Sequence, residues 1–270
     1  MSRLFMGIAT ALSILLQAAS AEAADGARAC AGRAGRTAQV AEVLDGGALR
    51  LAEGEETTLA HVLLPSRLDG AAGATALAEE ARALLARLTA GETVRLVAAD
   101  REPDRYGRLP SHVVAGAGKG TWIQGALLTA GLARVSSFAE PAGCAKALLA
   151  MEAEARLARR GLWADPAYAV RDAGDIEALN RLIGRFAVIE GRILEAGTAR
   201  DAIYLNFGQR WKEDFTVKIA GRTRNGIKAV LGDPLALKGR QVRVRGWVES
   251  ENGPMIVLTR PEQIELIEGR

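Results

Sequence analysis

The chain has 270 residues, of which 49% are hydrophobic and 25% are charged, and its formal net charge is +3. This length suits one large domain or two small ones, each with a core of its own. Residues 24–168 carry 17 basic and 17 acidic side chains, whereas residues 169–270 carry 17 and 14. Because nucleic-acid-binding domains usually have a clear basic excess, this charge balance disfavours tight nonspecific nucleic-acid binding by the first half.

The N-terminus has the order of a secretory signal peptide. Arg3 precedes an apolar run from Leu4 to Leu16, and the small-residue pattern Ala21-Glu22-Ala23 follows. This apolar run is short for a bilayer span, so we predict a signal peptide over residues 1–23 and a periplasmic or secreted mature protein. A retained N-terminal anchor is the alternative. No later stretch has about 18 consecutive apolar residues, so we expect no transmembrane anchor after cleavage.

Cys30 and Cys144 are the two cysteines of the chain. In an oxidising compartment paired thiols persist as disulfides, so a Cys30–Cys144 bridge is one hypothesis. Two unrelated buried thiols are the other.

The first half of the mature chain predicts a small barrel. Residues 37–64 alternate apolar and polar side chains, with breaks at 45–47 and 53–54, which indicates three antiparallel strands. Leucines at helical spacing predict a helix over residues 71–90. Two more strands flank the sequence DRYGR at 104–108, and two further helices follow at about 121–131 and 141–160. Five strands with a helix between the third and fourth is the order of an OB-fold barrel.

The second half repeats this order. Residues 166–182 are proline-led and charged, and we predict a linker with a short helix there. A second OB-like barrel is then predicted over residues 183–268, with one helix between its third and fourth strands. The expected fold class is therefore α+β, mostly β with helices, in two successive barrels.

Three stretches of the first half resemble the thermonuclease family. They are DRYGR (104–108), ALLTAGLARV (126–135) and EAEARLARRGLW (152–163), and their joint order is more specific than any one alone. The family consists of secreted, calcium-dependent phosphodiesterases built on an OB fold, and the similarity covers residues 37–165. The resemblance implies carboxylates that hold calcium, a glutamate that handles the attacking water and two arginines that neutralise the phosphate.

The chain departs from the family at most of these positions. The calcium-binding aspartate of the first turn is replaced by Gly47. Aligned on the proline of the third strand, the positions of an arginine, an aspartate and the glutamate hold Thr58, Leu63 and Ser66. Arg108 is the one family catalytic position retained. We therefore predict no catalytic set, no metal site and no cofactor, with calcium expected only if the nuclease is active.

Neighbouring residues are the alternative source of a site. Asp45, Glu53, Arg67 and Asp69 lie near these positions in the sequence, but a shift of one residue on a strand turns a side chain to the opposite face. His61 and His112 have no partners at metal-ligand spacing, which disfavours zinc.

Arg105, Tyr106 and Arg108 allow two interpretations. They could form a remnant phosphate clamp in which Tyr106 stacks on a base. Alternatively, the turn is structural, with Gly107 at positive φ and with Asp104 and the arginines in local hydrogen bonds.

The second barrel interleaves aromatic and basic residues, which suits weak nucleic-acid or sugar binding. The aromatic residues Tyr204, Phe207, Trp211 and Phe215 lie among basic residues in the segment 204–219. Arg243 and Arg245 share one face of a later strand. The alternative is that the aromatic residues form the core and the arginines a solvated face.

Together these patterns predict an exported thermonuclease-like protein that has lost catalysis and serves as a binding or scaffolding module of the cell envelope. Its partner would be nucleic acid, an envelope protein or an envelope polymer. An active nuclease with a rearranged metal site and a purely structural envelope protein are the two alternatives.

Overall fold

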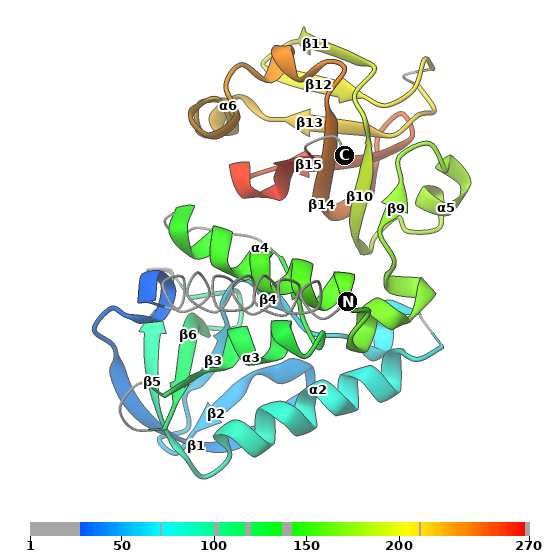
Figure 1. Ribbon diagram of the computed structural model, residues 1–270. Helices are drawn as coiled ribbons and strands as arrows, with labels where there is room; N and C mark the ends of the chain where they lie inside the picture. Colours follow the sequence, from blue (N-terminus) through cyan, green and yellow to red (C-terminus); the bar gives the residue numbers. More distant parts are fainter. Residues whose placement is uncertain are drawn as a thin grey trace, which may run out of the picture. The chain divides into compact units, whose positions relative to one another are not determined.

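The computed structural model describes residues 28–70, 72–99, 103–116, 120–136, 142–210 and 212–267. These residues fall into two compact units, which divide between Trp163 and Ala164. Each unit combines a curved sheet with helices (Figure 1), so the predicted α+β class is confirmed. The predicted signal peptide, residues 1–23, lies outside the described residues. No helix in the described part of the chain is long and apolar enough to cross a membrane.

The first unit contains a closed five-stranded barrel. Its strands are β1 (Arg36–Val43), β2 (Leu49–Leu51), β3 (Glu56–Leu59), β5 (Thr93–Ala98) and β6 (Leu109–Ala115). Neighbouring strands are antiparallel, except that β3 pairs in parallel with β6 and thereby closes the sheet on itself. The helix α2 (Ala74–Thr89) connects the third strand of the barrel to the fourth, as predicted.

Helices and short strands complete this unit. On α2, the helical spacing of apolar residues buries Ala81 and Leu85 completely. The remaining elements are β4 (Val62–Leu63), β7 (Thr121–Trp122), α3 (Ile123–Thr129), β8 (Arg134–Val135) and α4 (Ala142–Leu157).

A disulfide joins Cys30, which precedes β1, to Cys144 on α4. The Cα atoms are 4.9 Å apart and both side chains are fully buried. The bridge therefore ties the start of the described chain to the last long helix of the first unit.

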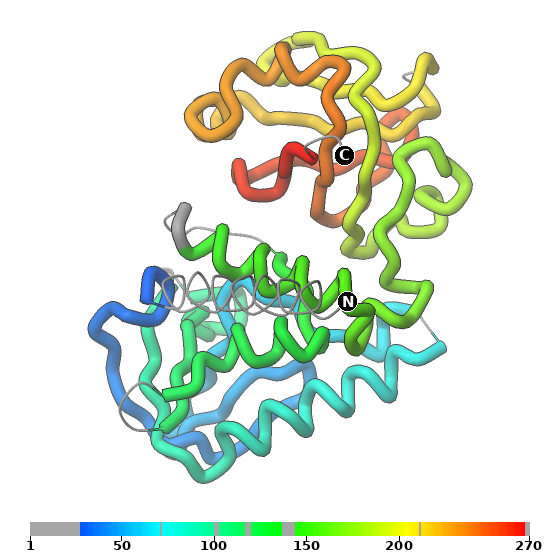
Figure 2. Tube along the Cα trace, viewed as in Figure 1, coloured from blue at the N-terminus to red at the C-terminus, as the bar shows by residue number. Residues whose placement is uncertain are grey.

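The second unit contains a curled sheet with the same strand order. Its main strands are β10 (Phe186–Arg192), β11 (Glu195–Ala199), β12 (Ala202–Asn206), β13 (Thr216–Ile219), β14 (Gln241–Ser250) and β15 (Pro254–Leu258). The sheet runs β11-β12-β13-β15-β14-β10, and only residues 193–194 separate β10 from β11 in the chain. The sheet consequently curls back towards its own beginning, as the trace in Figure 2 shows.

The parallel pair of this sheet is β13 with β15, which corresponds to β3 with β6 in the first unit. When β10 and β11 are counted as one strand, the helix α6 (Gly221–Leu231) again lies between the third and fourth strands, as predicted. Alternation along the strands fills the interior: Ile203 and Leu205 on β12 are buried, and Phe215 beside β13 is fully buried with them.

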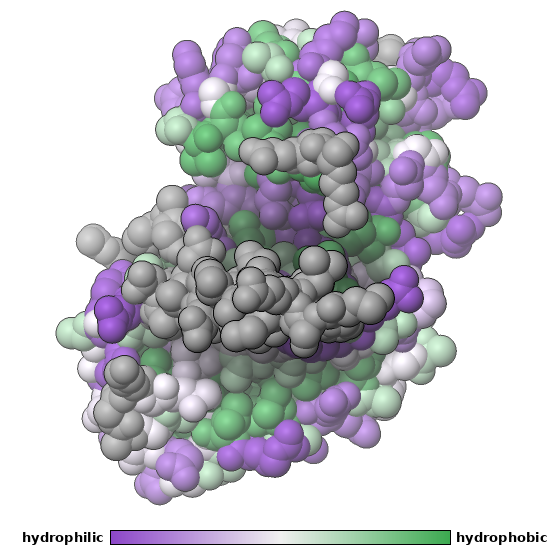
Figure 3. Space-filling model, in the orientation of Figure 1, coloured by the Kyte–Doolittle hydropathy of each residue, from purple (hydrophilic) through white to green (hydrophobic). Residues whose placement is uncertain are grey.

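The segment predicted as a linker is part of the second unit. It contains the expected short helix, α5 (Ile176–Asn180), and also the strand β9 (Arg171–Asp172), which pairs in parallel with β10. A further strand, β16 (Ile264–Leu266), pairs with β14. Hydrophilic and hydrophobic residues are mixed over the visible surface of each unit (Figure 3).

Candidate functional site

The DRYGR sequence forms a tight turn between β5 and β6. One carboxylate oxygen of Asp104 accepts hydrogen bonds from the backbone N–H groups of Tyr106, at 2.8 Å, and Arg108, at 3.0 Å. The other carboxylate oxygen of Asp104 accepts from the Arg108 guanidinium, with Nε at 3.0 Å and Nη2 at 2.9 Å. Gly107 has φ +78°, a conformation that favours glycine. The structural interpretation of this turn therefore accounts for Asp104, Gly107 and the Arg108 side chain.

Partial burial alone would raise the pKa of the Asp104 carboxyl, but the hydrogen bonds from Arg108 and Tyr106 outweigh it and lower the pKa below its usual value. Tyr106 is 65% exposed, and the guanidinium carbons of Arg105 and Arg108 lie 4.8 and 4.7 Å from its ring centroid. The two arginines flank the tyrosine, so Arg108, the retained family residue, is engaged by both Asp104 and Tyr106.

The turn at residues 45–47 follows β1, and the resemblance in the sequence led us to expect the family's calcium-binding turn here. Gly47 is buried and has φ +83°. A Cβ atom built on Gly47 would lie 2.5 Å from Cδ2 of Leu64. The isobutyl group of Leu64 therefore occupies the space into which a side chain at position 47 would project. An aspartate could not be accommodated there without displacing this leucine.

A pocket of about 320 Å³ lies beside this turn. It is lined by Asp45, Gly46, Gly47, Leu64, Pro65, Ser66, Arg67, Leu68, Ala78, Glu79 and Arg82. Two of these residues are acidic. Glu79 is paired with Arg67 at 3.5 Å, and Asp45 is exposed at the rim. The pocket thus offers one carboxylate without a basic partner, whereas calcium takes six to eight oxygen ligands.

The other candidate replacements have structural roles or point elsewhere. Asp69 accepts a hydrogen bond from the backbone N–H of Ser66 at 3.0 Å and contacts the Arg134 guanidinium at 3.4 Å. Glu53 is exposed in the turn between β2 and β3 and does not line the pocket.

The aligned family positions do not supply oxygen ligands in a cluster either. Thr58 lies on β3 opposite Pro110, and Leu63 lies on β4 opposite Arg134. Ser66 uses its hydroxyl to accept from the backbone N–H of Leu68 at 3.1 Å. The donor set around Gly47 and Leu64 therefore does not fit a calcium ion.

His61 and His112 lie together in the first unit, with ring centroids 5.3 Å apart. His112 is fully buried, and its Nε2 lies 3.7 Å from Sγ of Cys144. Burial, reinforced by the neighbouring His61 and Arg33, lowers the pKa of His112 to about 3. Because both nearby sulfurs are consumed in the disulfide, this cluster has no thiolate ligands for zinc.

The arginines predicted to contact nucleic acid in the second unit are held in ion pairs. Arg243 pairs with Glu190 at 2.6 Å, and Arg245 pairs with Glu265 at 2.6 Å. The Arg245 side chain is only 1% exposed, so the alternative of a solvated arginine face is wrong for this residue. Trp211, the third predicted contact, lies outside the described residues.

A groove on the second unit contains Tyr204, one of the aromatic residues that the sequence pattern offered for stacking, but its described lining includes neither of the predicted arginines, Arg243 and Arg245. Its volume is about 510 Å³, and it lies over β11, β12 and β13. Tyr204, Arg200 and Asn206 line it. The signal available in the sequence was the alternation of Tyr204 and Asn206 with the apolar residues of β12, which predicts that both face away from the core.

Residues 57–165 match the family model described as staphylococcal nuclease homologue. None of the curated proteins compared with the chain matches it. The match begins after the turn at 45–47 and ends at the boundary between the two units. Together with the closed five-stranded barrel, the match shows a staphylococcal nuclease homologue domain at residues 57–165, consistent with a thermonuclease-like OB fold.

Proposed function

We propose that this chain is an exported protein whose nuclease homologue domain has lost phosphodiesterase chemistry and acts as a binding or scaffolding module of the cell envelope. The observation that carries the proposal is the packing of Leu64 over Gly47, where the family places an acidic ligand. Hydrolysis by the family chemistry needs a cation held by several carboxylates and a base for the attacking water. Asp45 alone supplies neither a complete ligand set nor a positioned base.

The Arg108 guanidinium is the one family group that persists, and it supports the same proposal. It donates to Asp104 and lies against Tyr106. An arginine can neutralise a phosphate, but it cannot activate water because its guanidinium stays protonated. The carboxylate beside it, Asp104, accepts from Arg108 and from two backbone N–H groups, so the residue is suited to stabilising the turn.

Export is supported by the order of residues 1–23 and by the disulfide. A Cys30–Cys144 bridge buried in the first unit is consistent with folding in an oxidising compartment. Cell fractionation of the tagged full-length chain tests this part of the proposal. We expect the processed, disulfide-bonded protein in the periplasm or medium, and recovery of the unprocessed chain in the cytoplasm would contradict it.

The loss of catalysis is tested by a calcium titration with single-stranded DNA and RNA substrates, using the purified mature protein. We expect no cleavage above the protein-free blank at any calcium concentration. Cleavage that requires calcium and disappears in Arg108→Ala, but persists in the neighbouring Arg105→Ala control, would show an active nuclease with a rearranged site.

A further inference from the structure

The groove on the second unit lies at a defined position in its strand order. It is bounded by the turn at residues 200–201, between β11 and β12, and by the turn at residues 251–253, between β14 and β15. When β10 and β11 are counted together as strand 1, β12 to β15 are strands 2 to 5. The two turns are then the loops that join strand 1 to strand 2 and strand 4 to strand 5. On OB folds, the face of strands 2 and 3 between these two loops is where oligonucleotides and oligosaccharides bind.

Tyr204 on β12 is the aromatic residue of the groove. Its cross-strand partner on β11 is Gly197, and a Cβ atom built on that glycine would meet no atom within 4 Å. The glycine therefore leaves open space beside the tyrosine ring. On the other side Lys218 is the cross-strand partner, with Nζ 5.8 Å from the ring centroid. The arrangement presents one side of a fixed aromatic ring to the groove.

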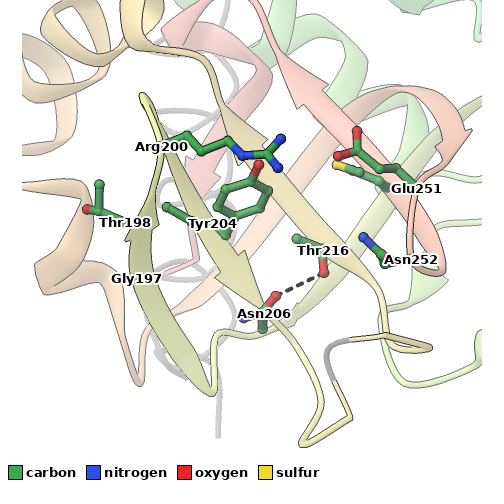
Figure 4. A pocket seen from close by; sticks show the side chains of 10 residues that line it. Gly197, Thr198, Arg200, Tyr204, Asn206, Thr216, Glu251 and Asn252 are labelled. Carbon is green, nitrogen blue, oxygen red and sulfur yellow. Dashed lines mark hydrogen bonds between the residues drawn. The ribbon is translucent and has the colours of Figure 1, made fainter.

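Polar side chains surround this ring on both sides of the groove. Figure 4 shows Arg200 beside Tyr204, with Glu251 and Asn252 across from them. Asn206 accepts a hydrogen bond from the hydroxyl of Thr216 at 2.9 Å, which fixes its amide at the floor. The groove consequently offers amide and guanidinium donors together with carboxylate and amide acceptors, which is the mixed set that hydroxyl groups of a ligand require.

The charges of the groove favour an oligosaccharide over an oligonucleotide as its ligand. Among the lining residues Arg200 is basic and Glu251 is acidic. The adjacent Lys218 is already paired with Glu251, at 3.0 Å, and this hydrogen bond is the main reason that the pKa of Lys218 is raised. At most one positive charge is left uncompensated. Proteins that bind nucleic acid gain most of their affinity from several phosphate contacts, typically about 6–10.

We propose that this groove binds a neutral oligosaccharide, with one sugar ring stacked on Tyr204 and its hydroxyl groups bonded to Asn206, Glu251 and Arg200. An aromatic platform with at most one surplus positive charge suits the apolar face and polar edge of a sugar ring better than it suits a phosphodiester backbone. The site belongs to the second unit, so its test is independent of whether the first unit cleaves nucleic acid.

The test uses the purified mature protein on an array of neutral glycans, followed by calorimetry with the glycan that gives the strongest signal. We expect binding whose affinity is unchanged when the salt concentration is raised. Tyr204→Ala should weaken it at least tenfold, whereas Tyr204→Phe should retain it. Gly197→Val should also weaken it about tenfold, because the new side chain fills the open space beside the ring while valine suits an exposed strand position.

Trp247→Ala is the matched control, since Trp247 is another exposed aromatic residue of the same sheet but does not line the groove. Thermal unfolding of each variant shows whether it folds. If Tyr204→Ala does not fold, Tyr204→Phe and Gly197→Val still decide the test. Failure of every neutral glycan to bind would overturn the proposal. Glycan binding that is unchanged in both Tyr204→Ala and Gly197→Val would also overturn it. So would salt-sensitive binding of single-stranded DNA or RNA in place of glycans.

Discussion

The two barrels of this chain share a strand order but differ in what their loops place beside the sheet. In the first, Leu64 packs over Gly47, where the resemblance implies an acidic ligand of the family. In the second, Gly197 and the turns at 200–201 and 251–253 leave a polar groove around Tyr204. The leucine fills the space beside one glycine, whereas the space beside the other glycine is open. A barrel's topology therefore locates a site without determining its chemistry.

The barrels also differ in how they are stabilised. The first has the Cys30–Cys144 disulfide and, packed against Cys144, the buried neutral side chain of His112. The described part of the second has no cysteine, and its interior is an apolar cluster that includes Phe207 and Phe215. Core mutations, reduction of the disulfide and low pH should consequently each lower the stability of one barrel and not of the other. Four experiments test this comparison.

The largest effect is expected for Phe215→Ala. This side chain is fully buried, and its ring centroid lies 5.0 Å from that of Phe207. Removing a buried aromatic ring costs about 3–5 kcal/mol of unfolding free energy. Hydrogen exchange should show loss of protection in the second unit while the first keeps its protection. Equal loss in both units, or a loss in Trp247→Ala as large as in Phe215→Ala, would contradict separate cores.

Reduction of the disulfide is expected to lower the stability of the first unit by about 2–4 kcal/mol. The bridge links residues 114 apart in the sequence, so it restricts a long segment of the unfolded chain. Urea unfolding with and without a thiol reductant measures the difference, and Cys30→Ala/Cys144→Ala should reproduce it. A change of the same size in the transition of the second unit would show that the units are coupled.

Acid should weaken the first unit through His112. Its pKa is about 3 in the folded protein and about 6.5 when unfolded, so the unfolded state binds the proton first. The contribution is complete above pH 6.5 and declines as the pH falls towards 3. Between pH 7.5 and 4.5 we expect a loss on the order of 2 kcal/mol. His112→Phe should remove this pH dependence from urea unfolding of the first unit; an unchanged profile would contradict a buried neutral histidine.

The smallest effect is expected at the DRYGR turn. Asp104→Ala removes the acceptor for the backbone N–H groups of Tyr106 and Arg108, and for the Arg108 side chain. Because the turn is partly exposed, we expect a loss of about 1 kcal/mol. Asp104→Asn should lose less, since its amide oxygen still accepts from the backbone. Urea unfolding checks the order, and Arg105→Ala, which leaves these hydrogen bonds intact, should be close to wild type.

The strand order of both barrels could be predicted because alternation and turn residues are local signals. The breaks at 45–47 and 53–54 separate strands as expected, and both helices between third and fourth strands lie where predicted. Two short strands of the second unit were not predicted. β9 has two residues and β16 has three, too few for a period to show, and each exists because β10 or β14 offers it a pairing edge.

The site residues were less predictable because their partners come from distant positions. The alternation on β14 correctly placed Arg243 and Arg245 on one face, but it could not show that Glu190 and Glu265 would pair with them. Likewise, the substitution of Gly47 was visible in the sequence, whereas the leucine that fills the space was not. The resemblance aligned Leu63 with an aspartate of the family, and it gave no sign that the next residue, Leu64, would lie against the glycine.

The central claim is that the first barrel retains the nuclease fold without a calcium site. Its most direct test is the anomalous difference map of a crystal of the mature protein soaked with Ca²⁺ and a nucleotide. The packing of Leu64 over Gly47 predicts no calcium peak in the pocket beside residues 45–47. An ordered calcium ion coordinated there by protein oxygens would contradict the account.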